Sequence, residues 1–267
     1  MGKLQPVKRN NIMQDFGLIS ILMAAYNAER TIDTAIDSVL NQSYGEFELI
    51  IVNDQSTDDT AKHIQHFLFD KRIKYIENGK NMGAAFSRKT ALEAATGEWI
   101  AILDSDDAWD SKKLHKQIQL QKEHNCSFLY TGMKYMDNQG VSIDYEFHVP
   151  ETIRYRDILK QNYIPNSSVL VKKSVYEKYA ITDDHIHEDY AMWLSMMKDN
   201  IVAYGIDEPL LIYRISPDSK SGNKFKAAKM TWDTYKYAGI GLKTRICCMV
   251  SYSIRNMLKY SSIRRAM

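Results

Sequence analysis

The sequence predicts an α/β protein with a Rossmann-like nucleotide-binding sheet, helices on both faces of that sheet, and a helical tail at the C-terminus. Between residues 18 and 124, short continuous apolar runs alternate with amphipathic stretches. Polar side chains directly follow three of these apolar runs. Strands buried on both faces read as continuous apolar runs, and regular alternation with helices implies a parallel sheet.

The elements of the first half follow from apolar spacing and from end signals. Leu18–Ala25 is an apolar run typical of a buried strand, and the next stretch places Ile32, Ile36 and Val39 at helical spacing. Ser56 opens a Ser-Thr-Asp-Asp sequence that predicts a capping box, and Gly97 is a typical stop after a helix. The expected strands are 18–25, 47–52, 73–76 and 99–103, and the expected helices are 29–40, 56–69, 84–95 and 111–124.

The second half is less regular. Apolar runs predict strands at 127–136, 167–171, 201–206 and 210–213, and a helix at 188–198. From about Ala227 the chain reads as helix to its end, with a break near Gly239 and Gly241. We therefore expect an extension at 1–16, a catalytic domain at 17–222 with halves 17–125 and 126–222, and a tail at 223–267.

Composition limits the possible classes of protein. With 45% apolar and 25% charged residues in a chain of 267, a substantial core is expected and disorder is not. A net charge of +2 gives no reason to expect a nucleic-acid partner. Three cysteines and no apolar run of membrane-spanning length point to a reducing, cytoplasmic location without a signal peptide.

The tail has a different charge from the rest of the chain. It holds ten Lys and Arg residues against one acid, Asp233, which leaves −7 for the remainder because the total is +2. Apolar residues from Leu242 to Leu258 repeat at helical spacing, and Arg245, Arg255 and Lys259 lie on the opposite face. This pattern favours peripheral binding to an anionic membrane, with the basic residues facing lipid phosphates. The alternative is a helix packed on the domain or on a dimer partner.

Polar residues follow the first, second and fourth expected strands. Tyr26 follows the first, Asp54 the second, and Asp104 and Asp106 the fourth. Because ligands of parallel sheets bind at the carboxyl ends of the strands, we expect one site at this edge. Asp54 could accept hydrogen bonds from a base or a ribose, or it could cap the next helix.

The acidic sequence Asp104-Ser-Asp106-Asp107 is the strongest indication of a metal. Three carboxylates in four residues repel one another unless a cation neutralises them. Hard ions such as Mn²⁺ or Mg²⁺ take oxygen ligands and leave positions open for phosphate. The alternative is an acidic turn before the next helix, with Asp107 as the cap residue.

Candidate site residues also occur in the second half. Glu188 and Asp189 open a predicted helix, where the helix dipole favours acids in any case. Trp193 lies on the same helical face as Asp189 and could stack on a bound ligand, or it could belong to the core. Arg214 and Ser216 could form a flexible lid, or a solvated basic loop.

Five segments in a fixed order resemble the opening of the family 2 glycosyltransferases. The resemblance covers about residues 17–120 and, with two weaker matches, reaches about 222. One departure is Met23-Ala24-Ala25, where the family has Thr-Pro before Tyr-Asn. The five segments are Ile21–Asn27, Ile36–Tyr44, Leu49–Asp58, Asn81–Arg88 and Gly97–Asp107, and the weaker matches are His187–Trp193 and Tyr213–Ser216.

The resemblance implies a GT-A fold and an inverting, metal-dependent transfer, usually from a UDP-sugar. It implies that Tyr26 lies against uracil, that Asp54 hydrogen-bonds it, and that Asn81 belongs to the donor site. Arg88 would support the diphosphate edge, or pair with an aspartate of the acidic cluster. Asp104 and Asp106 would carry the metal, with Asp106 the more direct ligand.

For the second half, the resemblance implies that Asp189 is the general base, and we place Glu188 and Trp193 at the acceptor. We expect the acceptor to be a lipid-linked glycan at the inner face of the cell membrane, in a bacterial capsule, O-antigen or teichuronic-acid-like pathway. Two alternatives remain. A nucleotidyltransferase would show a Gly-rich basic loop where this chain has Ala24–Asn27, and an inert nucleotide-sugar-binding recruitment module would not need Asp189.

Overall fold

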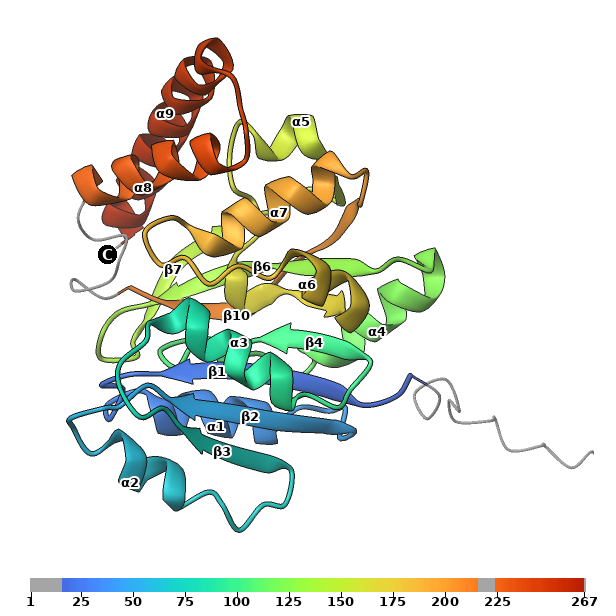
Figure 1. Ribbon diagram of the computed structural model, residues 1–267, viewed down its shortest axis with the longest axis vertical. Coiled ribbons are helices and arrows are strands. Elements are labelled where there is room, and N and C mark those ends of the chain that lie inside the picture. The colour runs from blue at the N-terminus through green and yellow to red at the C-terminus, as the bar shows by residue number, and fades with distance from the viewer. Residues whose placement is uncertain (1–15, 216–223, 267) are drawn as a thin grey trace, which may run out of the picture.

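A ten-stranded mixed sheet runs through the protein, with helices on both of its faces (Figure 1). The computed structural model describes residues 16–215 and 224–266. The strand order is β3-β2-β1-β4-β9-β6-β10-β5, while β7 pairs with β6 and β8 with β10. The predicted α/β class with a helical tail is confirmed. The expected extension and Ser216 lie outside the described residues, apart from Phe16.

The first half is the predicted parallel sheet. Strands β1 (Ile19–Ala25), β2 (Phe47–Asn53), β3 (Ile73–Glu77) and β4 (Trp99–Ile102) pair in parallel. Every residue of β2 and β4 is buried, which explains why apolar residues dominate both strands, with Glu48 and Asn53 as the buried polar members of β2. The connecting helices are α1 (Ile32–Leu40), α2 (Thr60–Gln65) and α3 (Ala84–Ala94).

The second half continues the same sheet. Strand β9 (Leu170–Lys172) lies antiparallel between β4 and β6 (Phe128–Met136), and β10 (Ala203–Arg214) runs parallel to β6. The remaining elements are β5 (Ala108–Trp109), β7 (Ser142–Phe147), β8 (Thr152–Ile153), α4 (Lys113–His124), α5 (Tyr155–Ile158), α6 (Lys173–Tyr179), α7 (Glu188–Lys198) and the 3-10 turn η1 (Asn166–Ser168).

Two predicted boundaries were wrong. The second helix begins at Thr60 rather than Ser56, because the Ser56 hydroxyl accepts the Asn27 amide and donates to Asn53 instead of capping a helix. The two strands expected at 201–206 and 210–213 form one strand, β10. Its register shifts around Pro209, which has no amide hydrogen to donate to the ladder.

A buried carboxylate joins the starts of four strands. The Glu48 side chain accepts hydrogen bonds from the Ser20 hydroxyl and the Thr96 amide, both at 2.6 Å, and pairs with Lys74 at 2.6 Å. Burial acts to raise the pKa of Glu48, but the bonds from Lys74, Ser20 and Thr96 outweigh it and lower the pKa to about 2. Glu48 therefore ties β1, β2, β3 and the turn before β4 together.

The tail consists of α8 (Lys224–Tyr237) and α9 (Leu242–Ala266), which lie beyond α7 at the end of the molecule opposite β3 (Figure 1). On the inner face of α9, Cys248 and Ile263 are buried. Tyr235 on α8 is fully buried and lies within hydrogen-bonding distance of the Tyr190 hydroxyl on α7. One face of the tail thus packs on the domain, as the alternative expectation required, while membrane binding by its other face stays a prediction.

The expected orientation of the basic residues of α9 was wrong. Lys259 lies over the Phe147 ring at 4.5 Å, Arg255 donates to the Tyr163 hydroxyl at 3.1 Å, and Arg245 lies over the Trp232 ring. All three contact other parts of the protein, although Arg255 stays exposed. The apolar stripe instead lies at the surface, half or more exposed at each position: Leu242, Ile246, Val250, Ile254, Met257 and Leu258. In the described ranges, no helix is both long and apolar enough to cross a membrane.

Candidate active site

The carboxyl ends of β1, β2 and β4 lie at one edge of the sheet because these strands are parallel. Tyr26 follows β1 and is 49% exposed, so its ring is accessible to a ligand. Asp54 follows β2, and its amide donates to the Ala25 carbonyl at 2.8 Å. Asn27 and Gln55, at the two strand ends, have left-handed backbone conformations that turn the chain away from the sheet.

Asp54 organises the loop that leads into α3. Its buried carboxylate accepts the amides of Met82 at 2.9 Å and Gly83 at 2.7 Å, and the Asn78 side-chain amide at 2.7 Å. It therefore does not cap α2, the helix that follows it in sequence. Asn81 lies in the same loop and is exposed. A hydrogen bond from Asp54 to a base stays a prediction.

Gly83 is required where this loop meets the second half. Its φ of +90° is unfavourable for residues with a side chain, and a Cβ there would overlap the Asp184 carboxylate. Asp184 lies close to the amide of Ala85 in the first turn of α3. The segment before α7 thus packs directly on the beginning of α3.

The three aspartates of the acidic turn have different environments. Asp107 is buried and accepts the Ser167 hydroxyl at 2.6 Å and the Arg214 amide at 3.0 Å. It does not cap α4, which begins after Lys112. Burial, followed by repulsion from Asp106 and Asp104, raises the pKa of Asp107 well above its ordinary value. Asp107 therefore fixes the turn.

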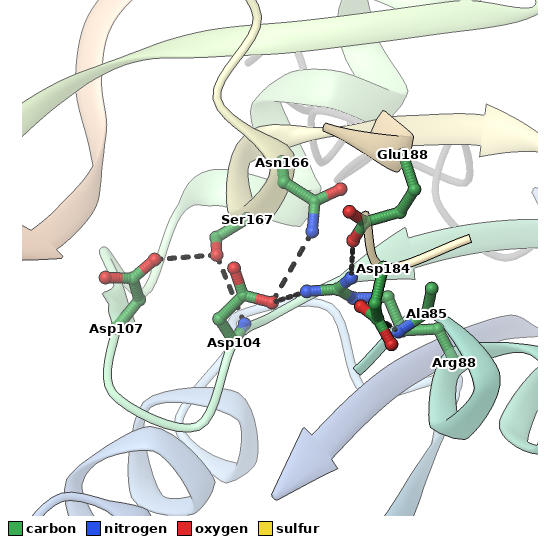
Figure 2. Close-up of polar contacts among 8 residues, drawn as sticks. All are labelled: Ala85, Arg88, Asp104, Asp107, Asn166, Ser167, Asp184 and Glu188. Carbon is green, nitrogen blue, oxygen red and sulfur yellow. Dashed lines mark hydrogen bonds and ion pairs between the residues drawn. The ribbon is translucent and has the colours of Figure 1, made fainter. Parts of the chain in front are cut away.

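Asp104 and Asp106 differ in how far they are engaged. Asp104 binds Arg88 at 2.6 Å and lies 3.4 Å from the Asn166 side-chain amide (Figure 2). Among the described residues, no other side chain donates a hydrogen bond to the Asp106 carboxylate. Burial, then repulsion from Asp104, raises the pKa of Asp106 to about 6.

These two aspartates fit an open cation site. Their oxygens are the ligands that Mg²⁺ and Mn²⁺ prefer, and a cation would relieve the repulsion that raises the pKa of Asp106. Within residues 16–215 and 224–266, no group of three His, Cys, Asp or Glu side chains forms a closed metal cage. Magnesium sites of proteins often use one or two carboxylates and complete their coordination with substrate phosphates and water.

The first turn of α7 faces this edge. The Glu188 carboxylate pairs with Arg88, and Asp189 lines a small pocket with Tyr176 and Met192 between α3, α6 and α7. Burial, followed by the negative charge of Glu188, raises the pKa of Asp189 to about 6. A carboxylate with such a pKa is ionised at neutral pH and is a better proton acceptor than an exposed one.

Two predicted site residues have other roles. Trp193 is fully buried and packs on the Phe128 ring with centroids 4.8 Å apart, so it cannot form an acceptor wall. Arg214 is 6% exposed and its Nε donates to the Asp106 carbonyl at 2.9 Å, so it supports the acidic turn and is not a lid. Arg88 pairs with Asp104, as one of its two predicted alternatives required.

The turn η1 was missed by the sequence reasoning. The Ser167 hydroxyl accepts the Asp104 amide at 3.1 Å and donates to Asp107 (Figure 2). The Trp109 indole donates to the Ser167 carbonyl at 2.6 Å. Residues 167–171 were expected to be a strand. The Pro-Asn-Ser-Ser sequence is the signal that could have indicated a turn instead, because Asn and Ser side chains hydrogen-bond nearby backbone.

A parallel nucleotide-binding half, an acidic strand end and a mixed second half are the features of the GT-A class of glycosyltransferases. The chain belongs to that class through one family in particular: residues 20–179 match the family described as glycosyl transferase family 2.

Relatives agree with this assignment. The chain is 39% identical to the putative teichuronic acid biosynthesis glycosyltransferase TuaG of Bacillus subtilis, over 82% of this chain and 87% of that protein. It is 38% identical to the Escherichia coli enzyme WfgD, described as UDP-Glc:α-D-GlcNAc-diphosphoundecaprenol β-1,3-glucosyltransferase, over 93% and 97% of the two chains.

Solved structures agree on the fold. The Staphylococcus aureus TarS structure with UDP superposes with a TM-score of 0.67 at 19% identity, over 83% of this chain and 64% of that one. A Pyrobaculum calidifontis mannosyltransferase with GDP-Man and Mn²⁺ gives 0.65 at 16% identity, over 88% and 68%. The protein is therefore a glycosyltransferase with a GT-A fold.

Proposed function

We propose that this glycosyltransferase moves a sugar, with inversion, from a UDP-sugar to a hydroxyl of a glycan acceptor and requires Mn²⁺ or Mg²⁺. The observation that carries the proposal is that Arg88 joins two carboxylate sites: it binds Asp104 of the acidic turn that also holds Asp106, and it lines the pocket in which the half-buried carboxylate of Asp189 lies. Such an arrangement provides a place for a diphosphate leaving group and a separate proton acceptor.

We assign each group of site residues one task in the reaction. Tyr26, Asp54 and Asn81 border the nucleotide end of the site, and Asp104 and Asp106 would hold the cation. When bound, the cation supplies positive charge that stabilises the leaving diphosphate. The ionised Asp189 accepts the proton of the acceptor hydroxyl, whose oxygen bonds to the anomeric carbon as the bond from that carbon to the diphosphate oxygen breaks. Attack from the face opposite the leaving group inverts the anomeric centre.

The acceptor is proposed from the relatives and the tail together. WfgD is named for a diphosphoundecaprenol-linked acceptor and TuaG for teichuronic acid, so we assign this chain to bacterial surface polysaccharide synthesis on a lipid-linked glycan. Such an acceptor places the enzyme at the inner, cytoplasmic face of the membrane.

The exposed stripe of α9 supports membrane association. Six large apolar side chains lie at the surface of this helix, where water contact is unfavourable. From Leu242 to Ala266 the helix has no acidic residue, and its basic residues Lys243 and Arg265 are exposed. Two copies of the chain meeting through α9 would bring like charges together, whereas an anionic lipid surface would attract them. A lipid surface is therefore the partner we propose.

A panel of UDP-sugars tests the donor and the roles of both carboxylates. Asp189→Asn should lower transfer by about 10²–10⁴-fold, as loss of a general base does, and leave UDP binding in Mn²⁺ unchanged. Asp106→Ala should abolish transfer and weaken UDP binding in Mn²⁺. Asp59→Asn, at an exposed aspartate of another helix, is the control and should behave as wild type.

Three results would contradict the proposal. Near wild-type turnover of Asp106→Ala would contradict the cation site. If Asp189→Asn lost donor binding as much as it lost transfer, Asp189 would be a donor-site residue. If the wild-type protein neither hydrolysed nor transferred any nucleotide-sugar while still binding it, the chain would be an inert recruitment module.

A further inference from the structure

Arg88 is a buried cation that bridges the two halves of the protein. Its side chain, on α3, is only 12% exposed and has one carboxylate on each side. One terminal nitrogen binds Asp104 at the end of β4 at 2.6 Å, and the other binds Glu188 in the first turn of α7 (Figure 2). Asp104 belongs to the proposed donor edge, and Glu188 is the neighbour of the proposed base.

The geometry of this bridge depends on the guanidinium group. Its terminal nitrogens are fixed in one plane and donate in two directions, which the single ammonium of a lysine cannot reproduce. In the described part of the chain, the Nε of Arg88 has no hydrogen-bond partner. The two carboxylates are therefore the groups that hold the Arg88 head, and Arg88 in turn holds them.

The beginning of α7 is fastened at two points. On the side of α3, Arg88 binds Glu188. On the side of α8, the His187 amide donates to the Thr234 hydroxyl at 3.0 Å. Successive helical residues point about 100° apart, so a helix that directs Glu188 at Arg88 directs Asp189 elsewhere. Here Asp189 lines the pocket beside Arg88.

We propose that Arg88 is a positioning residue for sugar transfer, which sets the place of the base Asp189 relative to the donor edge by binding Asp104 and Glu188 at once. This inference rests on the proposed function. It also reassigns Glu188, which was expected at the acceptor: its carboxylate is the anchor of the bridge, while Asp189 meets the acceptor hydroxyl.

The reaction requires the base Asp189 and the donor edge at Asp104 to lie at a fixed separation, and the bridge connects the two. The acceptor hydroxyl must lie between the base and the anomeric carbon, and a misplacement of about 1 Å can cost a factor of about 10² in rate. Asp104 moves with β4 and Asp189 with α7, which are separate elements with their own packing. An ion pair on each side of one planar, largely buried guanidinium holds these elements in register.

The test is a double-mutant cycle on the ion pair between Arg88 and Glu188. Glu188→Gln should lower kcat at least tenfold and leave UDP affinity in Mn²⁺ unchanged, because the Asp104 arm stays intact. Arg88→Met should lower kcat further and weaken UDP binding. In Arg88→Met, the added Glu188→Gln should cost less than threefold more, because the bridge is already broken. Arg88→Lys should not restore kcat.

Hydrogen exchange gives a readout that does not depend on activity. The amides of residues 188–192, at the start of α7, should exchange at least tenfold faster in Glu188→Gln and in Arg88→Met than in wild type. Arg72→Met is the matched control: Arg72 also binds a carboxylate, Asp70, through two nitrogens, but far from the site. It should change neither kcat nor exchange in α7.

The outcomes separate this inference from the function on which it rests. Unchanged exchange in α7, multiplicative effects in the double variant, or full activity of Arg88→Lys would each overturn the bridge. Absence of any transfer by the wild-type protein would overturn the proposed function, while accelerated exchange in both variants would still support the bridge.

Discussion

Carboxylates that are close in sequence have separate roles at this site because each has different neighbours. Asp107 is buried against Ser167 and the Arg214 amide, Asp104 is held by Arg88, and Asp106 is bound by no other described side chain. Asp189 and Glu188 divide in the same way, since Arg88 engages only Glu188. The free member of each group, Asp106 or Asp189, is the one to which the proposed reaction assigns the more direct role.

The pH dependence of transfer should report the base. The pKa of Asp189 is raised to about 6 by burial and then by Glu188, while His187 and Arg88 act to lower it. Because the ionised form accepts the proton, kcat should be constant above neutrality and fall about tenfold per unit as pH drops below about 6. The profile should be measured at saturating Mn²⁺ and donor.

Glu188→Gln checks whether Asp189 causes this fall of kcat at low pH, the acidic limb of the profile. Removing the adjacent negative charge should lower the pKa of Asp189, so the limb should move to lower pH even though kcat is reduced. A limb that stays in place, or that moves to higher pH, would show that another group controls it.

At this scale, sequence reasoning found residue types but not their orientation. Asp54, Asp104 and Asp106 could be placed because a parallel sheet puts strand ends at one edge. Trp193 could not, since helical spacing does not reveal which face meets the core. Arg214 could not either, because its partners, the carbonyls of Asp106 and Asp137, are remote in sequence.

Among the elements, the starts of the parallel strands are held by one carboxylate, Glu48. Replacing it with Gln should destabilise the protein by about 1–3 kcal/mol, since buried partners lose a charged acceptor. Urea denaturation should show this loss, and Glu46→Gln, at an exposed neighbour, should not. A loss equal to that of the Glu46 control would contradict the structural role.

The pH dependence of stability gives a second check of the same group. The pKa of Glu48 lies at about 2 in the folded protein, below its ordinary value of 4.5. The stabilisation is therefore fully present above pH 4.5 and is lost as pH falls from there toward 2. Wild type should lose more stability than Glu48→Gln over this interval.

The buried parallel strands were predictable because burial on both faces leaves a run of mostly apolar residues, as in Leu49–Val52 of β2 and in β4. The short elements were not. Strands β5 and β8 have two residues each and exist through pairing with β10, and η1 exists through the acidic turn above it. Such partners are fixed only when the whole chain has folded.

For the molecule as a whole, the proposed membrane association through the surface of α9 can be tested directly. Replacing both Ile246 and Ile254 by Asn should abolish co-sedimentation with phosphatidylglycerol vesicles. Melting should barely change, because both positions are about half exposed. Phe69→Asn, which makes the same kind of change at an apolar residue exposed on another surface, should bind vesicles as wild type does.

Salt and lipid charge should both matter to this binding. Each basic residue near an anionic surface contributes about 1 kcal/mol at most, so added salt or neutral phosphatidylcholine vesicles should weaken it. If light scattering instead showed a dimer that the Ile246 and Ile254 substitutions dissociate, with no vesicle binding by wild type, the stripe would be a contact between copies.

The position of β9 limits how these enzymes can be recombined. Residues 170–172 belong to the second half by sequence, yet they lie between β4 and β6 and pair with Trp99, Ile100 and Ala101. A chimera that takes its first half from one enzyme and its second half from another must therefore match the β4–β9 register as well as the join near residue 125. A chimera made to exchange acceptor specificity therefore has a second junction, the β4–β9 pairing inside the sheet. This junction is remote in sequence from the point at which the two chains are joined.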